Sequence, residues 1–221
     1  QVLPHWCGPS YCSLILLAAA YLRSKRVGAL NSLLPFPLKP AAIVALSIIL
    51  TGILAVNFYP GSLSTAGGNK KGEGDFTLDM YGWNDLRKQF SRLQETQVRE
   101  GRMKPNSFII SNKWFPAAHL DHYVATPLHI PFVAYGGVTD IHQYAWINRL
   151  QPGLQPGDDA WCIVPSNAWF DAAALFGKQF ETIIFVGQLP QFRSGKCCRY
   201  FYIYQLKNFR RGKAADVPAP E

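Results

Sequence analysis

The residues best suited to metal chemistry form a short group between positions 119 and 129. His119, Asp121, His122 and His129 offer imidazole and carboxylate ligands, and residues three positions apart share one face of a helix. A complete zinc site would need at least one further ligand brought by the fold. The same segment also fits an amphipathic helix whose polar residues lie on the surface. We therefore expect no metal site here, and a metal-dependent hydrolase built on His119 and His122 is kept as an alternative.

Other arrangements that support catalysis are missing from the sequence. It has no Gly-x-Ser-x-Gly motif, and no Gly-x-Gly-x-x-Gly motif follows a predicted strand. The glycine- and lysine-rich residues 67–74 lack the spacing of a phosphate-binding loop. Asp158 and Asp159 precede a predicted strand, where we expect a role in a turn. The region after residue 75 therefore contains no self-contained catalytic constellation.

The cysteines do not form a recognisable framework. The chain has 5 cysteines, an odd number, without the Cys-x-x-Cys spacing of a zinc or redox site. Free cysteines commonly behave as small buried hydrophobic residues. We therefore expect packed thiols at Cys7, Cys12, Cys162, Cys197 and Cys198.

Two uncharged, apolar runs near the start predict membrane helices. Residues 41–58 carry no charge, and 18 residues at about 1.5 Å each span roughly 27 Å, close to the thickness of a bilayer core. Residues 6–22 form a second uncharged run, although Gly8 and Pro9 shorten its regular part. The alternative for residues 41–58 is a buried helix of a soluble protein, but such helices are usually shorter and carry a polar stripe. We predict two transmembrane helices.

Charge divides the chain and orients it. All 14 acidic residues lie after position 60, so the linker at 23–39 is purely basic. Basic loops stay on the cytoplasmic side, which places everything after Tyr59 on the outer face. The net charge of +8 is partly this linker, and no basic stripe with interleaved aromatic residues predicts nucleic-acid binding. We expect a surface linker at 61–74, an external domain at 75–210 and a disordered tail at 211–221.

Hydrophobic periodicity in the external domain alternates between helix and strand. The predicted helices are 84–100 with Asn84 as N-cap, 114–124, and 168–180 capped by Asn167, and the predicted strands are 107–111, 131–135, 160–164, 182–187 and 199–206. Strands that alternate with helices predict an α/β domain with a mostly parallel sheet. We expect the last, aromatic strand to pair antiparallel at the edge.

Several segments together resemble a known family. They are LPHWCGPSY (3–11), DFTLDMYGW (75–83), SNKWFPAAHLDHYV (111–124), HQYAWIN (142–148) and DDAWCIVPSN (158–167). In this order they resemble the C-terminal end of bacterial membrane glycosyltransferases of family 39, which are relatives of the protein O-mannosyltransferases and of the aminoarabinose transferase that modifies lipid A. The chain begins with neither Met nor a signal peptide, so we expect it to be the C-terminal part of a longer protein.

The resemblance implies a function and some site residues. It implies a transferase of the bacterial cytoplasmic membrane that moves a sugar from a polyprenyl-phosphate donor to a glycan, lipid or protein acceptor outside. The catalytic acid would lie upstream, with no cofactor within these residues and a divalent metal as an option in the complete enzyme. His5, Trp6 and Trp83 match family segments, and His5 and Trp6 would lie near the donor phosphate. Anchoring at the membrane interface is the alternative role for these side chains.

Aromatic residues near predicted loop ends suggest what the external domain does. Rings offer broad faces for stacking on sugars, and loops at strand ends carry ligand sites in α/β folds. We predict an acceptor contact at Trp146, with packing in the core as the alternative. A membrane-anchored binding or scaffold domain without catalysis is the competing function. The other aromatic residues in such positions are Trp114, Tyr144 and Trp169.

Overall fold

The computed structural model describes residues 8–25, 38–58, 63–64 and 66–210. It divides into two compact units, Gln1–Leu54 and Ala55–Glu221. The predicted tail at 211–221 lies outside the described residues. Each unit is taken by itself below.

Two helices precede the α/β domain, and one of them is a candidate membrane span. α2 (Leu38–Phe58) is mainly apolar, with Lys39 in its first turn as its one charged residue, and it has no buried residue and is long enough to cross a membrane. α1 (Gly8–Lys25) covers most of the other predicted span, but its apolar part, Cys12–Ser24, is shorter, about 20 Å as a straight helix. Within the described ranges, the structure therefore supports one candidate transmembrane helix and does not show the second that we predicted.

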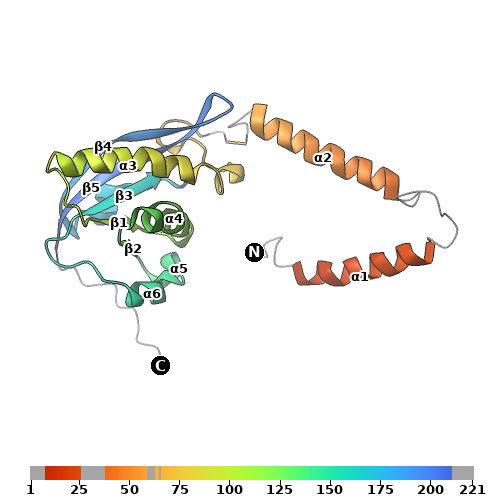
Figure 1. Ribbon diagram of the computed structural model, residues 1–221, viewed down its shortest axis with the longest axis horizontal. Helices are drawn as coiled ribbons and strands as arrows, with labels where there is room; N and C mark the ends of the chain where they lie inside the picture. The colour runs from red at the N-terminus through yellow and green to blue at the C-terminus, as the bar shows by residue number, and fades with distance from the viewer. Residues whose placement is uncertain (1–7, 26–37, 59–62, 65, 211–221) are drawn as a thin grey trace. The chain divides into compact units, whose positions relative to one another are not determined.

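The second unit is a mixed α/β domain around one five-stranded sheet (Figure 1), with strand order β2-β1-β3-β5-β4. β1 pairs in parallel with β2 and β3, whereas β5 pairs antiparallel with both β3 and β4. The antiparallel strands are the long ones, so our prediction of a mostly parallel sheet is wrong. The bounds are β1 (Phe108–Ser111), β2 (Phe132–Ala134), β3 (Ala160–Pro165), β4 (Phe180–Arg193) and β5 (Lys196–Phe209).

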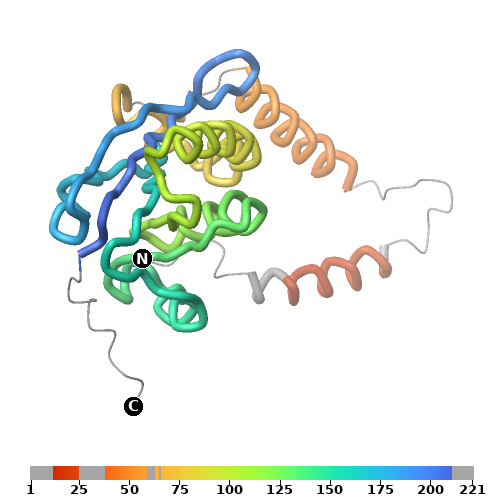
Figure 2. The backbone as a smooth tube through the Cα atoms, turned by 60° about the vertical axis from the view of Figure 1, so that its left-hand side comes forward, coloured from red at the N-terminus to blue at the C-terminus, as the bar shows by residue number. Residues whose placement is uncertain are grey.

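A long hairpin of β4 and β5 explains the difference from the predicted topology. The two strands are joined by a two-residue turn in which Ser194 and Gly195 both have positive φ angles, 47° and 77°. Such turns match the twist of antiparallel strands and favour tight hairpins. In Figure 2 the two blue strands run side by side up to this turn. β5 therefore lies inside the sheet, and β4 forms its edge.

Helices cover the two faces of the sheet unequally. One face packs against α3 (Trp83–Arg99), α4 (Trp114–Leu120), α5 (Val138–Ile141) and α6 (Tyr144–Ile147), whose core side chains include Leu86, Phe90, Leu120 and Ile141 around Trp161. The other face packs against the short α7 (Ala172–Phe176). The remaining turns are η3 (Gly68–Lys70), η4 (Phe76–Leu78), the π-helical η5 (Asp121–Ala125), η6 (Thr126–Leu128), η7 (Asn148–Leu150) and η8 (Ser166–Ala168).

Two helix starts differ from the prediction. α3 begins at Trp83, and its N-cap is Gly82 with a left-handed backbone, so Asn84 lies inside the helix. The predicted helix at 168–180 is reduced to α7 because Asp171, rather than Asn167, provides the cap. The Asp171 carboxylate accepts hydrogen bonds from the backbone N–H groups of Ala173 and Ala174 at 2.9 and 3.1 Å.

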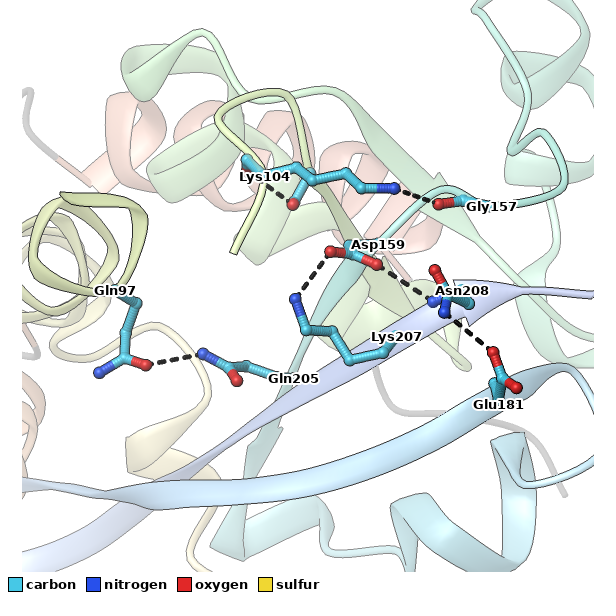
Figure 3. Close-up of polar contacts among 9 residues, drawn as sticks. Gln97, Lys104, Gly157, Asp159, Glu181, Gln205, Lys207 and Asn208 are labelled. Carbon is cyan, nitrogen blue, oxygen red and sulfur yellow. Dashed lines mark hydrogen bonds and ion pairs between the residues drawn. The ribbon is translucent and has the colours of Figure 1, made fainter. Parts of the chain in front are cut away.

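Polar contacts fix the amino end of β3 (Figure 3). The buried Asp159 carboxylate lies 2.8 Å from Lys207 Nζ and accepts a hydrogen bond from the Asn208 backbone N–H at 3.1 Å. Asp158 has the predicted turn role, since its carboxylate accepts from the backbone of Gln155 at 2.7 Å. Asp159 and Lys207 also line an open cleft of about 560 Å³. Because these two charges pair with each other, we assign a structural role to this end of the sheet, where β3 begins.

Candidate functional site

The carboxyl ends of the three parallel strands lie at the end of the sheet opposite to Asp159, and the loops that follow these strands lie there together. β1 ends at Ser111 and leads into α4, β2 ends at Ala134 and leads into α5, and β3 ends at Pro165 and leads into η8. β2 and β3 flank β1 on opposite sides. Loops diverge at such a point, and α/β folds place ligand sites beside it. Side chains at this edge are therefore the first candidates for function.

A run of aromatic and imidazole rings lies at this edge, on α4, η5 and the junction between α5 and α6. Trp114 contacts Phe115 and His142, both with ring centroids 5.5 Å apart. Phe115 contacts His119 at 4.8 Å, and His119 contacts Tyr123 at 5.8 Å. Trp114 is 41% exposed. We call these five residues the aromatic–histidine surface.

His119 is the buried member of the aromatic–histidine surface. Its ring stacks on Trp83 with an interplanar angle of 8° and a centroid distance of 4.8 Å. Burial lowers the pKa of His119, and the charges of Arg199 and His122 lower it further. The imidazole is therefore neutral at neutral pH, with one ring nitrogen that donates and one that accepts hydrogen bonds.

His142 has an unusual backbone. Its φ and ψ angles are 48° and −124°, a combination that L-residues rarely adopt, and it sits between α5 and α6. The conformation is held by hydrogen bonds from His142 N to Val138 O at 2.8 Å and from Ala145 N to His142 O at 3.0 Å. Such strain costs about 1–3 kcal/mol and concentrates at functional sites. Here it accompanies an exposed imidazole beside the Trp114 ring.

The fully buried Arg199 lies next to Trp83, on which His119 of the aromatic–histidine surface stacks. Each Arg199 nitrogen donates to a protein oxygen, on Gln191, Asn167 or Tyr81. Its guanidinium also lies 4.6 Å from the Trp83 ring centroid. Burial lowers the pKa of Arg199 to about 9, which leaves it charged at neutral pH. With every nitrogen engaged, Arg199 holds these segments together and is not placed to bind a ligand.

A second arginine attaches the segment at 75–83 to the hairpin. Arg193 donates to Thr77 Oγ1 and Thr77 O at 2.8 and 2.9 Å, and it lies 3.9 Å from the Tyr81 ring centroid. Burial raises the pKa of Asp79, while the charge of Arg199 opposes the shift. Together the two arginines bring 75–83 against the end of β3, and the stack of Trp83 on His119 joins that segment to α4. Segments far apart in the sequence thus form one edge.

The predicted site residues have different positions. His5 and Trp6 lie outside the described residues. Trp83 is buried, and its indole N–H donates to Asp79 O at 2.7 Å, so its ring packs in the core. Trp146 is 56% exposed on α6, and within the described part of the chain no ring contact joins it to the aromatic–histidine surface.

The structure also shows where the other predicted aromatic residues and the predicted metal ligands lie. Tyr144 is buried, with its hydroxyl donating to Asp121 at 3.0 Å, and Trp169 packs against the core of the opposite face. Among the residues with described positions, no group of three or more metal-binding side chains occurs, so the ligands between 119 and 129 do not converge there.

Sequence reasoning did not single out His142. Its position after the second parallel strand was a usable signal, because Trp114 begins the helix that follows the first strand and the two strands are neighbours. The contact itself depends on the positive φ of His142, for which the sequence has no pattern.

Comparison of the chain with protein-family models, curated proteins and solved structures finds no match.

Proposed function

We propose that this chain is the C-terminal part of an integral-membrane glycosyltransferase and that its α/β domain holds the acceptor. The enzyme would move a sugar from a polyprenyl-phosphate donor to a glycan, lipid or protein acceptor outside the bacterial cytoplasmic membrane. The observation that carries the proposal is the exposed Trp114 ring beside the strained His142 at the carboxyl edge of parallel strands. Two membrane spans, near 6–22 and 41–58, belong to this proposal.

The chemistry of the aromatic–histidine surface suits a sugar. The half-exposed indole of Trp114 offers an apolar face for a pyranose ring. The imidazole of His142 stands at the side of this face and offers hydrogen bonds to hydroxyl groups. The described residues show no nucleophile paired with a base, so bond making would occur upstream. His5 and Trp6 are the proposed contacts to the donor phosphate.

The test is Trp114→Ala in the intact enzyme. Loss of a stacking face worth about 1 kcal/mol should raise the acceptor KM by about fivefold while the donor KM stays unchanged. Phe185→Ala is the matched control, because Phe185 is similarly exposed on β4, away from this edge. An unchanged acceptor KM in a folded Trp114→Ala enzyme would remove the proposal. Trp146→Ala in the same assay tests whether the acceptor also reaches α6.

A membrane-anchored binding domain without catalysis is the second candidate. It is favoured by the way Arg199 joins Gln191, Asn167 and Tyr81, because these contacts hold the loops beside the aromatic–histidine surface in fixed positions. The coding sequence upstream of Gln1 separates the two functions. Many further apolar segments with an acidic residue in the first external loop support the transferase. A start codon directly before Gln1 leaves the binding domain.

A further inference from the structure

The loop that follows β2 carries two polar side chains that border the same exposed glycine, Gly137. A Cβ at Gly137 would lie 3.7 Å from Asp140 Oδ2 and 3.8 Å from Thr139 Oγ1, and all three residues are exposed. Within the part of the chain that the structure describes, no hydrogen bond or ion pair joins either side chain to another residue. We call Thr139 and Asp140 the β2-loop pair.

The β2-loop pair lies beside the aromatic–histidine surface. Asp140 precedes His142 by two residues, a span of at most about 7 Å, and the His142 ring contacts Trp114. The loops after β1 and β2 pack tightly here, since a Cβ at Gly136 would lie 3.2 Å from Asn112 O and 3.6 Å from Asp140 Cβ. Trp114 follows Asn112 by two residues. A ligand on the Trp114 ring is therefore within reach of the pair.

The polar groups of the β2-loop pair suit hydroxyl groups. The Asp140 carboxylate only accepts hydrogen bonds and can take one at each oxygen, whereas the Thr139 hydroxyl both donates and accepts. Neighbouring hydroxyl groups on a sugar ring supply the donors that the carboxylate needs. Hydrogen bonds of this kind, to an ionised group, are stronger than those between neutral groups.

The charges beside Trp114 match an uncharged ligand. The exposed Lys113 directly precedes Trp114 and carries the charge opposite to that of Asp140. With one charge of each sign, these two residues together create no net attraction for an anion or a cation. A phosphorylated or carboxylated ligand would in addition be repelled by the Asp140 carboxylate.

We propose that Asp140 is a specificity-determining residue that selects an uncharged sugar as the acceptor. The sugar ring would stack on Trp114, and two neighbouring hydroxyl groups would bond to the Asp140 carboxylate and to Thr139 Oγ1. This inference rests on the proposed function and narrows its acceptor to one whose binding residue is a neutral sugar.

Asp140 also has a simpler structural role, for which the chain offers a matched control. It lies in the first turn of α5, where a negative charge stabilises a helix. Asp85 is likewise an exposed carboxylate in a first turn, that of α3. Asp85→Ala therefore removes the same kind of helix contribution without touching the β2-loop pair.

The experiment measures sugar binding to the full chain in lipid nanodiscs by ligand-observed NMR. The probes are neutral methyl hexopyranosides, analogues that each lack one hydroxyl group, and the corresponding uronic acids and sugar phosphates. Asp140→Ala should weaken binding of the preferred neutral sugar by about tenfold, because a hydrogen bond to a charged group is worth at least this much. The parent chain should bind one deoxy analogue about tenfold more weakly than the intact sugar, and Asp140→Ala should bind both equally. Asp85→Ala should behave like the parent.

Three results would overturn the inference. They are tighter binding of a uronic acid or sugar phosphate than of the neutral sugar, a preference for the intact sugar that persists in Asp140→Ala, and an equal loss of binding in Asp85→Ala. Trp114→Ala in the same assay separates the two proposals. If it weakens binding while Asp140→Ala does not, this inference fails and the proposed function stands. If no neutral sugar binds, or neither change weakens binding, both fail.

Discussion

At the scale of single residues, the strain at His142 gives the clearest prediction. His142→Gly should raise the free energy of unfolding by about 1 kcal/mol, because relief of the strained backbone exceeds the entropic cost of glycine. The same change should raise the acceptor KM, since it removes the imidazole beside Trp114. Urea unfolding and acceptor kinetics on the same preparation would measure both.

His129→Gly is the matched control for this change. His129 is also exposed with a positive φ of 54°, but its ψ of 35° lies in the ordinary left-handed region. We expect a smaller gain in stability and no change in acceptor kinetics. A loss of stability in His142→Gly would show that the backbone of His142 is not strained.

His119 predicts how stability depends on pH. An unfolded histidine has a pKa of about 6.5, and burial lowers the value in the folded domain. As the pH falls below about 6.5, the unfolded chain takes up a proton before the folded domain does, so stability falls until the lower folded pKa is passed. Above about 6.5 the contribution of His119 is constant.

Urea unfolding between pH 7.5 and about 5 would measure this slope. His119→Phe keeps a ring between Trp83 and Tyr123 and should reduce the slope, whereas His129→Gln on the surface should keep it. An unaltered slope in His119→Phe would contradict the assignment to His119.

At the scale of elements, the start of α3 depends on Gly82. Its φ is 79°, and a Cβ there would lie 1.3 Å from Gln191 Nε2, the amide whose oxygen accepts from Arg199. Gly82→Ala should therefore cost about 3 kcal/mol, from left-handed strain together with a disturbed buried hydrogen bond. Chemical denaturation would measure the loss.

Gly101 separates the two causes. It ends the turn after α3 with a φ of 70°, but a Cβ there meets nothing within 4 Å. Gly101→Ala should cost only about 1–2 kcal/mol, from strain alone. Equal losses at Gly82 and Gly101 would mean that Gln191 moves aside without cost.

The sequence predicts the helices and strands of this domain better than their pairing. α3, β1 and β3 lie close to their predicted ranges because long amphipathic and short buried patterns have clear periods. β4 was predicted to stop at Gly187, but the strand continues through a bulge there, where the register shifts between Phe185 and Gly187. The topology then follows from the Ser194–Gly195 turn, which joins β4 directly to β5 as an antiparallel hairpin.

The candidate site was predictable only in part. Trp114 begins α4 shortly after a buried strand, and that position follows from the sequence. Arg199 is fully buried, has no carboxylate partner at hydrogen-bond distance and instead joins three separate segments of the candidate site. Its place in an aromatic strand does not reveal these contacts. Tertiary packing selects such contacts, and local patterns do not record them.

At the scale of the whole molecule, α2 is the segment that would attach the domain to a membrane. Its 21 residues span about 32 Å, and large apolar side chains along it, such as Ile43, Leu46 and Ile48, are exposed. An uninterrupted apolar surface of this length is stable when lipid covers it. The positive linker at 23–39 would then stay inside, which leaves the domain outside.

Labelling of intact cells with a membrane-impermeant thiol reagent tests this arrangement. Asn69→Cys lies on an exposed turn after α2 and should be labelled from outside, whereas Ser32→Cys in the basic linker should be labelled only after the cells are permeabilised. The parent chain gives the background from its native thiols, of which Cys162 and Cys198 are buried. Labelling of Ser32→Cys alone would invert the topology and place the domain in the cytoplasm. Labelling of both from outside would mean that α2 does not cross the membrane.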